Sequence, residues 1–141
     1  MRIGGMAFRT IWPGSDAASV QIIDQTRLPH EFEIVSIKTA SEAARAIKEM
    51  QVRGAPLIGV MAAYGLALAM RAEPSDTNLD AACAVLATAR PTAVNLHWAL
   101  VAMRRHFLAL PPTDRGESGF AHAGAIAEQD IALCEAIGEH G

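Results

Sequence analysis

The sequence VRGAPLIG at positions 52–59 leads into the longest apolar run of the chain, which covers positions 57–70. This run is shorter than the roughly 18 residues that suggest a membrane-spanning helix, so no membrane insertion is expected. It contains two glycines and a tyrosine, which suit a helix buried at the centre of a domain. Pro56 falls in the first turn, where a helix tolerates a missing N–H. The segment therefore predicts a buried central helix that ends near Arg71.

Helical patterns continue on both sides of this run. Thr39 and Glu42 have the spacing of a capping box, and the helix that they begin is predicted to stop at Gly54. A loop with a cap at positions 74–77 precedes a predicted helix over 79–88. Thr92 is expected to cap a helix that runs to about Leu108. The polar stretch 111–119 is predicted to be flexible, and a last helix is expected from about Phe120 to position 137.

Three short segments of strand-forming residues precede the helices, at positions 8–12, 19–24 and 32–37. The short turns between them favour an antiparallel meander. The predicted fold class is therefore α+β. A small sheet over positions 1–38 and about five helices over 39–141 are expected to form one domain. Strands and helices do not alternate, which argues against a Rossmann domain.

Composition narrows the possible functions. The net charge is −3 and the sequence has no basic stripe, which argues against binding to nucleic acid. No secretory signal is evident, so we expect a cytoplasmic protein. Cys83 and Cys134 form no CxxC motif and are expected to be buried, reduced thiols. None of the five histidines joins a cluster with metal-ligand spacing, so no metal site is predicted.

Two arginines stand at predicted helix boundaries: Arg53 before Gly54, and Arg90 before Pro91. A helix N-terminus presents unpaired N–H groups and a partial positive charge, and a nearby guanidinium completes a receptor for a phosphate or carboxylate. The pair predicts a site for a small anion or a sugar phosphate. The alternatives are that Arg53 is merely solvated and that Arg90 is a cation favoured by a helix C-terminus. Asn95 either faces the same pocket or is a buried polar residue bonded to the backbone.

The remaining polar residues give no catalytic assignment. Tyr64 is expected to pack in the core with its hydroxyl satisfied, and His97 is expected to be packed rather than catalytic. No nucleophile motif of the GxSxG type is present. The residues alone therefore predict an anion-binding site without a nucleophile, a base or a cofactor motif.

The elements VRGAPLIG at 52–59 and ARPTAVNL at 89–96 closely resemble the N-terminal half of the methylthioribose-1-phosphate isomerase family. The sequences IW at 11–12, IIDQ at 22–25, LP at 28–29 and IGEHG at 137–141 extend this resemblance over nearly the whole chain. The resemblance implies an aldose–ketose isomerisation in methionine salvage, from methylthioribose 1-phosphate to methylthioribulose 1-phosphate, without a cofactor. It also implies that Arg53, Gly54 and Ala55 bind the substrate and that Arg90 is a second substrate contact.

The sequence departs from the family in one respect. The family's catalytic cysteine lies in a Thr-His-Cys-Asn-Ala-Gly-like motif of a C-terminal Rossmann-like domain, and its catalytic aspartate follows later. Neither motif occurs here, and neither Cys83 nor Cys134 has that context. We therefore expect a substrate-positioning N-terminal domain that is inactive alone. Its expected partners are the sugar-phosphate substrate, the missing C-terminal catalytic domain and a second copy in a homodimer.

Two other functions fit the same resemblance. One is an isomerase of the same superfamily that acts on ribose 1,5-bisphosphate, whose second phosphate needs further cationic contacts. The other is a non-enzymatic role, because regulatory subunits of the eukaryotic translation-initiation nucleotide exchange factor share this ancestry and act by protein contacts. The two intact arginine elements favour the enzyme.

Overall fold

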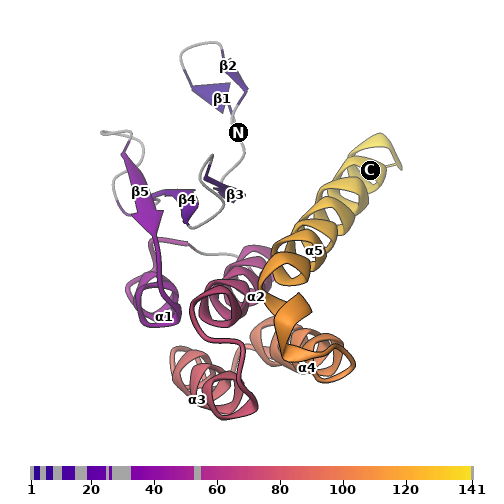
Figure 1. Ribbon diagram of the computed structural model, residues 1–141. Helices are drawn as coiled ribbons and strands as arrows, with labels where there is room; N and C mark the ends of the chain where they lie inside the picture. The colour runs from indigo at the N-terminus through magenta and orange to yellow at the C-terminus, as the bar shows by residue number, and fades with distance from the viewer. Residues whose placement is uncertain are drawn as a thin grey trace.

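The computed structural model describes residues 2–3, 6–7, 11–14, 19–24, 26, 33–52 and 55–140. Within these ranges the chain combines small antiparallel sheets with five helices (Figure 1). The predicted α+β class is therefore confirmed. A short hairpin of β1 (Arg2–Ile3) and β2 (Met6–Ala7) at the N-terminus was not predicted from the sequence.

The main sheet is a three-stranded meander with β4 in the middle. It contains β3 (Ile11–Pro13), β4 (Val20–Ile23) and β5 (Ile34–Ile37), all paired antiparallel. Pro13 lies on an edge strand, where a missing N–H does not interrupt a ladder on both sides. The apolar residues of β4 are fully buried and attach the sheet to the helical core. The predicted meander is confirmed, although positions 8–10 and 32 of its predicted strands lie outside the described residues.

Helix α1 (Ala40–Lys48) begins with the predicted cap. The Glu42 N–H donates to Thr39 Oγ1 at 3.0 Å, and Glu42 Oε2 accepts from the Lys38 N–H at 2.8 Å. The return bond therefore reaches one residue further back than in a standard capping box. The first contact satisfies a donor that the start of the helix leaves unpaired, and the second satisfies the N–H of the residue before the cap.

The C-terminus of α1 differs from the prediction. The helix ends at Lys48, not at Gly54, because Met50 adopts a left-handed conformation with φ of 65°. The Gln51 N–H then donates to the Ala46 carbonyl at 2.9 Å and the Met50 N–H to the Ile47 carbonyl at 3.2 Å. These two bonds form a Schellman motif, which usually has glycine at the left-handed position.

Helix α2 (Ala55–Ala72) is the central helix, as predicted. It packs against α1, α3 (Asp76–Ala87), α4 (Val94–Leu108) and α5 (Pro112–His140), which surround it in Figure 1. Positions 58–70 are all buried, as expected for a helix that is apolar on every side. Tyr64 is buried among them with its ring 6.1 Å from that of Phe120, so its predicted place in the core is confirmed.

The other helix starts also differ from the sequence predictions. Ser75 caps α3 by accepting from the Asn78 N–H at 3.1 Å, so α3 begins before position 79. Ala93, not Thr92, is the N-cap of α4. The stretch 111–119 is not a flexible connection, because α5 begins at Pro112. A Cβ on Gly119 would lie 2.9 Å from the Phe107 ring, so this glycine permits close helix packing.

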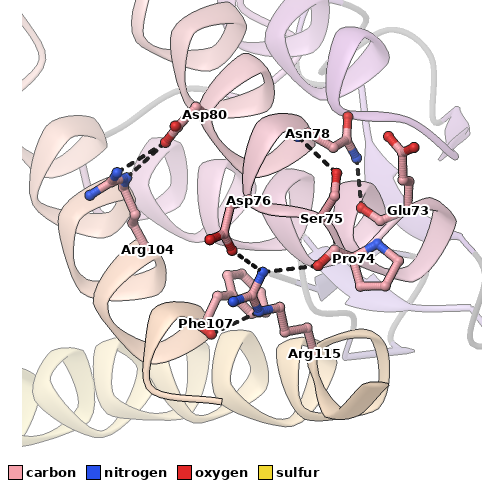
Figure 2. A network of polar contacts seen from close by, with 9 residues as sticks. All are labelled: Glu73, Pro74, Ser75, Asp76, Asn78, Asp80, Arg104, Phe107 and Arg115. Carbon is pink, nitrogen blue, oxygen red and sulfur yellow. Dashed lines mark hydrogen bonds and ion pairs between the residues drawn. The ribbon is translucent and has the colours of Figure 1, made fainter. Parts of the chain in front are cut away.

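Arg115 ties the ends of three helices together (Figure 2). Its side chain is 4% exposed, and its Nε donates to the Phe107 carbonyl at 2.9 Å. One terminal nitrogen donates to the Pro74 carbonyl at 2.9 Å and to Asp76 Oδ1 at 2.6 Å. Burial of this guanidinium is tolerated because the Asp76 carboxylate balances its charge and two backbone carbonyls accept from its N–H groups.

Helix α4 is apolar on two opposite sides. Its inner side packs into the core, whereas Val94, Trp98, Val101 and Leu108 are 78%, 56%, 58% and 44% exposed. These four residues, called the outer α4 stripe below, recur at spacings of four, three and seven, which places them on one side of the helix. No helix within the described ranges meets the length and apolarity needed to span a membrane.

Candidate anion-binding site

Helix packing brings the N-termini of α2 and α4 to the same end of the domain. A Cβ on Gly59 of α2 would lie 3.0 Å from the Asn95 carbonyl oxygen, so the first turn of α4 touches α2 about one turn after α2 begins. Further along, Phe107 of α4 and Ala67 of α2 both border Gly119. The two helices therefore run in the same direction, and their partial positive charges add at one end.

Helix α5 runs in the opposite direction. Its residue Gly116 faces Arg71, near the C-terminus of α2, and Gly124 faces the Tyr64 hydroxyl. The later turns of α5 therefore lead toward the end of the domain where α2 and α4 begin.

The turn before α4 is closed by two hydrogen bonds. The Ala93 N–H donates to the Arg90 carbonyl at 3.1 Å, and His97 Nε2 lies 2.9 Å from the Pro91 carbonyl oxygen. A carbonyl can only accept, so Nε2 carries the proton. Ala93 makes no side-chain capping bond, so its own side chain occupies none of the first N–H groups of α4.

Arg90 lies in this turn and is half-buried. Its Nε donates to the Ile47 carbonyl at 3.4 Å, close to the C-terminus of α1, where the helix dipole favours a cation. The sequence left open the alternative that Arg90 is a cation favoured by a helix C-terminus. The structure does place Arg90 at a helix C-terminus, but the helix is α1 and not α3. The contact through Nε leaves the two terminal nitrogens of the guanidinium without a partner among the described residues.

The other predicted site residues can be placed only in part. Ala55 is the first residue of α2, whereas Arg53 and Gly54 lie outside the described residues. Asn95 is half-buried where α4 touches α2, and its side chain has no hydrogen bond within the described part of the chain. The substrate-binding roles of Arg53, Gly54, Ala55 and Arg90 therefore stay predictions.

Asp24 is a residue of this region that the sequence analysis did not single out. It is 4% exposed at the end of β4, and its Oδ1 accepts from the Thr26 N–H at 3.0 Å and from Thr26 Oγ1 at 2.6 Å. Its Oδ2 accepts from Gln51 Nε2 at 3.1 Å, which ties the sheet to the segment just before Arg53. The available signal was an acid directly after the buried pair at positions 22–23.

Other titratable groups lie away from the starts of α2 and α4. Near the C-terminus of α4, the His106 ring stacks on that of His122 at 4.0 Å, and its Nε2 lies 2.7 Å from Ser118 Oγ. Burial and the neighbouring His122 lower the pKa of His106. On α3, burial raises the pKa of the half-buried Cys83 thiol. Neither group adds to the site around Arg90.

Comparison with known proteins places these features in a family. Positions 51–141 match the model of the Initiation factor 2 subunit family. A methylthioribose-1-phosphate isomerase of Methylocella silvestris is 63% identical over 141 residues, which is 100% of this chain and 38% of that protein.

Two solved structures share the fold. The 5-methylthioribose 1-phosphate isomerase of Pyrococcus horikoshii OT3 has a TM-score of 0.78 and 36% identity, over 87% of this chain and 36% of its own. The translation initiation factor eIF-2B subunit delta of A. fulgidus has a TM-score of 0.80 and 32% identity, over 89% of this chain and 38% of its own. The chain spans well under half the length of each of these three proteins. Because the family model covers more than half of it, the chain belongs to the Initiation factor 2 subunit family.

Proposed function

We propose that this chain is the substrate-positioning part of an aldose–ketose isomerase that converts methylthioribose 1-phosphate to methylthioribulose 1-phosphate. In this proposal the chain binds the phosphate, and the further sequence present in the longer relatives supplies the chemistry. The isolated chain then binds its ligand weakly and turns over no substrate.

One observation carries this proposal. The start of α4 touches α2 about one turn after α2 begins, and Arg90 lies in the turn that leads into α4. Two helix N-termini together with a guanidinium form a receptor suited to a phosphate. The names of the similar isomerases then supply the substrate that carries this phosphate.

The chemistry explains why a positioning part is useful. Aldose–ketose isomerisation moves a hydrogen between adjacent sugar carbons, through a base and an acid or as a hydride shift. Either route requires the two carbons to be held in one orientation, away from water. A fixed phosphate at one end of the sugar provides that orientation without taking part in the reaction.

The test is a titration of the 141-residue chain with methylthioribose 1-phosphate and with inorganic phosphate, by isothermal calorimetry and amide NMR. Arg90→Ala and Arg53→Ala each remove a charge-assisted contact and are expected to weaken binding roughly tenfold or more. Arg104→Ala is the matched control. Arg104 also belongs to the α4 region, but it pairs with Asp80 at 3.0 Å on the outside of the domain.

Three results would contradict the proposal: equal binding by Arg90→Ala and the wild type, a loss of binding as large in Arg104→Ala, or turnover by the isolated chain. Shifts of the amide signals of residues 93–95 on ligand addition are the expected sign that the α4 N-terminus is the receptor.

The similarity to the eIF-2B subunit delta favours a second candidate, a non-enzymatic subunit that acts by protein contacts. That candidate expects no phosphate-dependent shifts near α4. The third candidate, an isomerase of ribose 1,5-bisphosphate, expects tighter binding of that bisphosphate than of methylthioribose 1-phosphate. The same titration, repeated with the bisphosphate, separates all three.

A further inference from the structure

We propose that His97 is a positioning residue of the anion site: its ring fixes the turn at positions 90–93 and thereby places Arg90 beside the N-terminus of α4. This inference rests on the proposed function, because it assigns His97 a role in the ligand binding proposed above.

The His97 side chain contacts a residue that precedes its own helix. The backbone N–H of His97 donates to the Ala93 carbonyl at 3.3 Å, so the residue is an ordinary member of α4. Only its ring leaves the helix, and Nε2 donates at 2.9 Å to the carbonyl of Pro91, six residues earlier. Together with the bond from the Ala93 N–H to the Arg90 carbonyl, the ring fixes the turn at two points.

This arrangement resolves a conflict between capping and anion binding. The usual N-cap residues fix a helix start by accepting from its first N–H groups, and an anion needs those same donors. Ala93 has no polar side chain, and it makes no capping bond. His97 instead acts as a donor to a carbonyl, so it orders the turn while the first N–H groups of α4 stay available for a ligand.

Arg90 depends on this order. Its contact with the Ile47 carbonyl is long, at 3.4 Å, and by itself it is a weak restraint on a flexible side chain. If the turn loosens, Arg90 moves relative to the helix N-terminus, and the ligand must order both at the moment of binding. Preorganised sites avoid that cost, so loss of the His97 contact should appear as lost affinity.

The experiment measures the affinity of the chain for methylthioribose 1-phosphate in His97→Leu, His97→Gln, Arg90→Ala and the double variant His97→Leu/Arg90→Ala. His97→Leu loses one hydrogen bond and is expected to bind about fivefold more weakly. His97→Gln keeps an N–H donor at a similar distance from the backbone and should recover most of this affinity. His122→Leu, a histidine replacement on α5, is the matched control and should bind like the wild type.

The double variant shows whether His97 acts through Arg90. If it does, His97→Leu causes little further loss once Arg90 is alanine, because the two effects are not additive. Nitrogen NMR of the imidazoles gives a readout that does not depend on the ligand. The His97 ring should be found with its proton on Nε2.

The two proposals fail in different ways. If Arg90→Ala does not weaken binding, the proposed function is wrong, and the role of His97 is lost with it. If Arg90→Ala weakens binding but His97→Leu does not, only the positioning role is wrong. Failure of glutamine to recover affinity, full additivity in the double variant, or a proton on Nδ1 in place of Nε2 would also overturn the positioning role.

Discussion

Met50 is the one non-glycine residue within the described ranges that has a positive φ, and it offers a simple test of the α1 terminus. A side chain in the left-handed region costs about 1 kcal/mol, and glycine recovers part of that while making the unfolded chain more flexible. Met50→Gly is therefore expected to raise the free energy of unfolding by about 0.5 kcal/mol. Urea denaturation followed by circular dichroism measures the change.

Lys48→Gly is the matched control for this substitution. Lys48 is also exposed, but it is the last residue of α1 and has helical geometry. Glycine there should lower the stability by about 1 kcal/mol. Opposite signs for the two glycine variants support the Schellman motif, whereas destabilisation by both contradicts it.

At the scale of single residues, the sequence predicts a helix end best where a side chain itself makes the capping contact. Thr39 caps α1 as predicted, and Ser75 caps α3 within the predicted loop at positions 74–77, because hydroxyl groups accept from free N–H groups. Thr92 was predicted to cap α4 in the same way, but Ala93 is the N-cap there. Met50 gives no such signal, because methionine has no preference for the left-handed conformation that it adopts here. Glycine is the usual signal, so Gly54 was predicted to end a helix that in fact ends at Lys48.

Helices α4 and α5 are joined near the C-terminus of α4 by the stacked rings of His106 and His122. Burial, followed by the charge of His122, lowers the pKa of His106 below its usual value of 6.5. The unfolded chain therefore takes up this proton more readily than the folded chain. The stabilising contribution is complete above about pH 6.5 and is lost as the pH falls through the lowered pKa of the folded state.

We expect the melting temperature to fall between pH 7.5 and pH 5, and to fall less in His106→Gln, which removes the titrating group. Differential scanning calorimetry at several pH values measures this slope. His97→Gln is the control, since it removes a histidine elsewhere on α4. An unchanged slope in His106→Gln would rule out this pair as its source.

At the scale of elements, the long central helix was predictable. A run of 14 apolar residues is too long for a typical strand, so a buried helix is the structure that fits it best. The start of α5 was not. Pro111 to Gly119 contains polar residues and two glycines, a composition typical of a loop. In the structure Gly116 and Gly119 lie against α2, where a side chain would lie tightly against Arg71 or collide with the Phe107 ring. The reason for these glycines is tertiary packing, which no local pattern contains.

Over the whole molecule, the outer α4 stripe is the largest group of exposed apolar side chains on one helix within the described ranges. Apolar surface of this kind favours association in water. The 141-residue chain is therefore expected to self-associate as its concentration rises, and Trp98→Lys should shift it toward the monomer. Sedimentation velocity over a concentration series measures both effects.

Ile34→Lys is the control, because Ile34 is 45% exposed on β5 and not on α4. If this variant shifts the equilibrium as much as Trp98→Lys, the association does not depend on the stripe. A chain that stays monomeric at all concentrations would contradict the expectation.

The site itself was only partly predictable at this scale. The arginine at position 90 was identified because it precedes a helix start, and the structure places it between α1 and α4. The contact of His97 with the Pro91 carbonyl and the contact of the buried Asp24 with Gln51 were not predicted, since each depends on which groups the fold brings within reach of a side chain.

The central position of α2 has a consequence for how the domain unfolds. Because α1, α3, α4 and α5 all pack against this one helix, none of them retains its main apolar contacts once α2 is lost. Opening of the domain is therefore expected to be a single cooperative event and not a sequence of separate ones. A small molecule held at the beginning of α2 would then protect every helix at once, including the distant C-terminal end of α4, from proteases that cleave only unfolded chains.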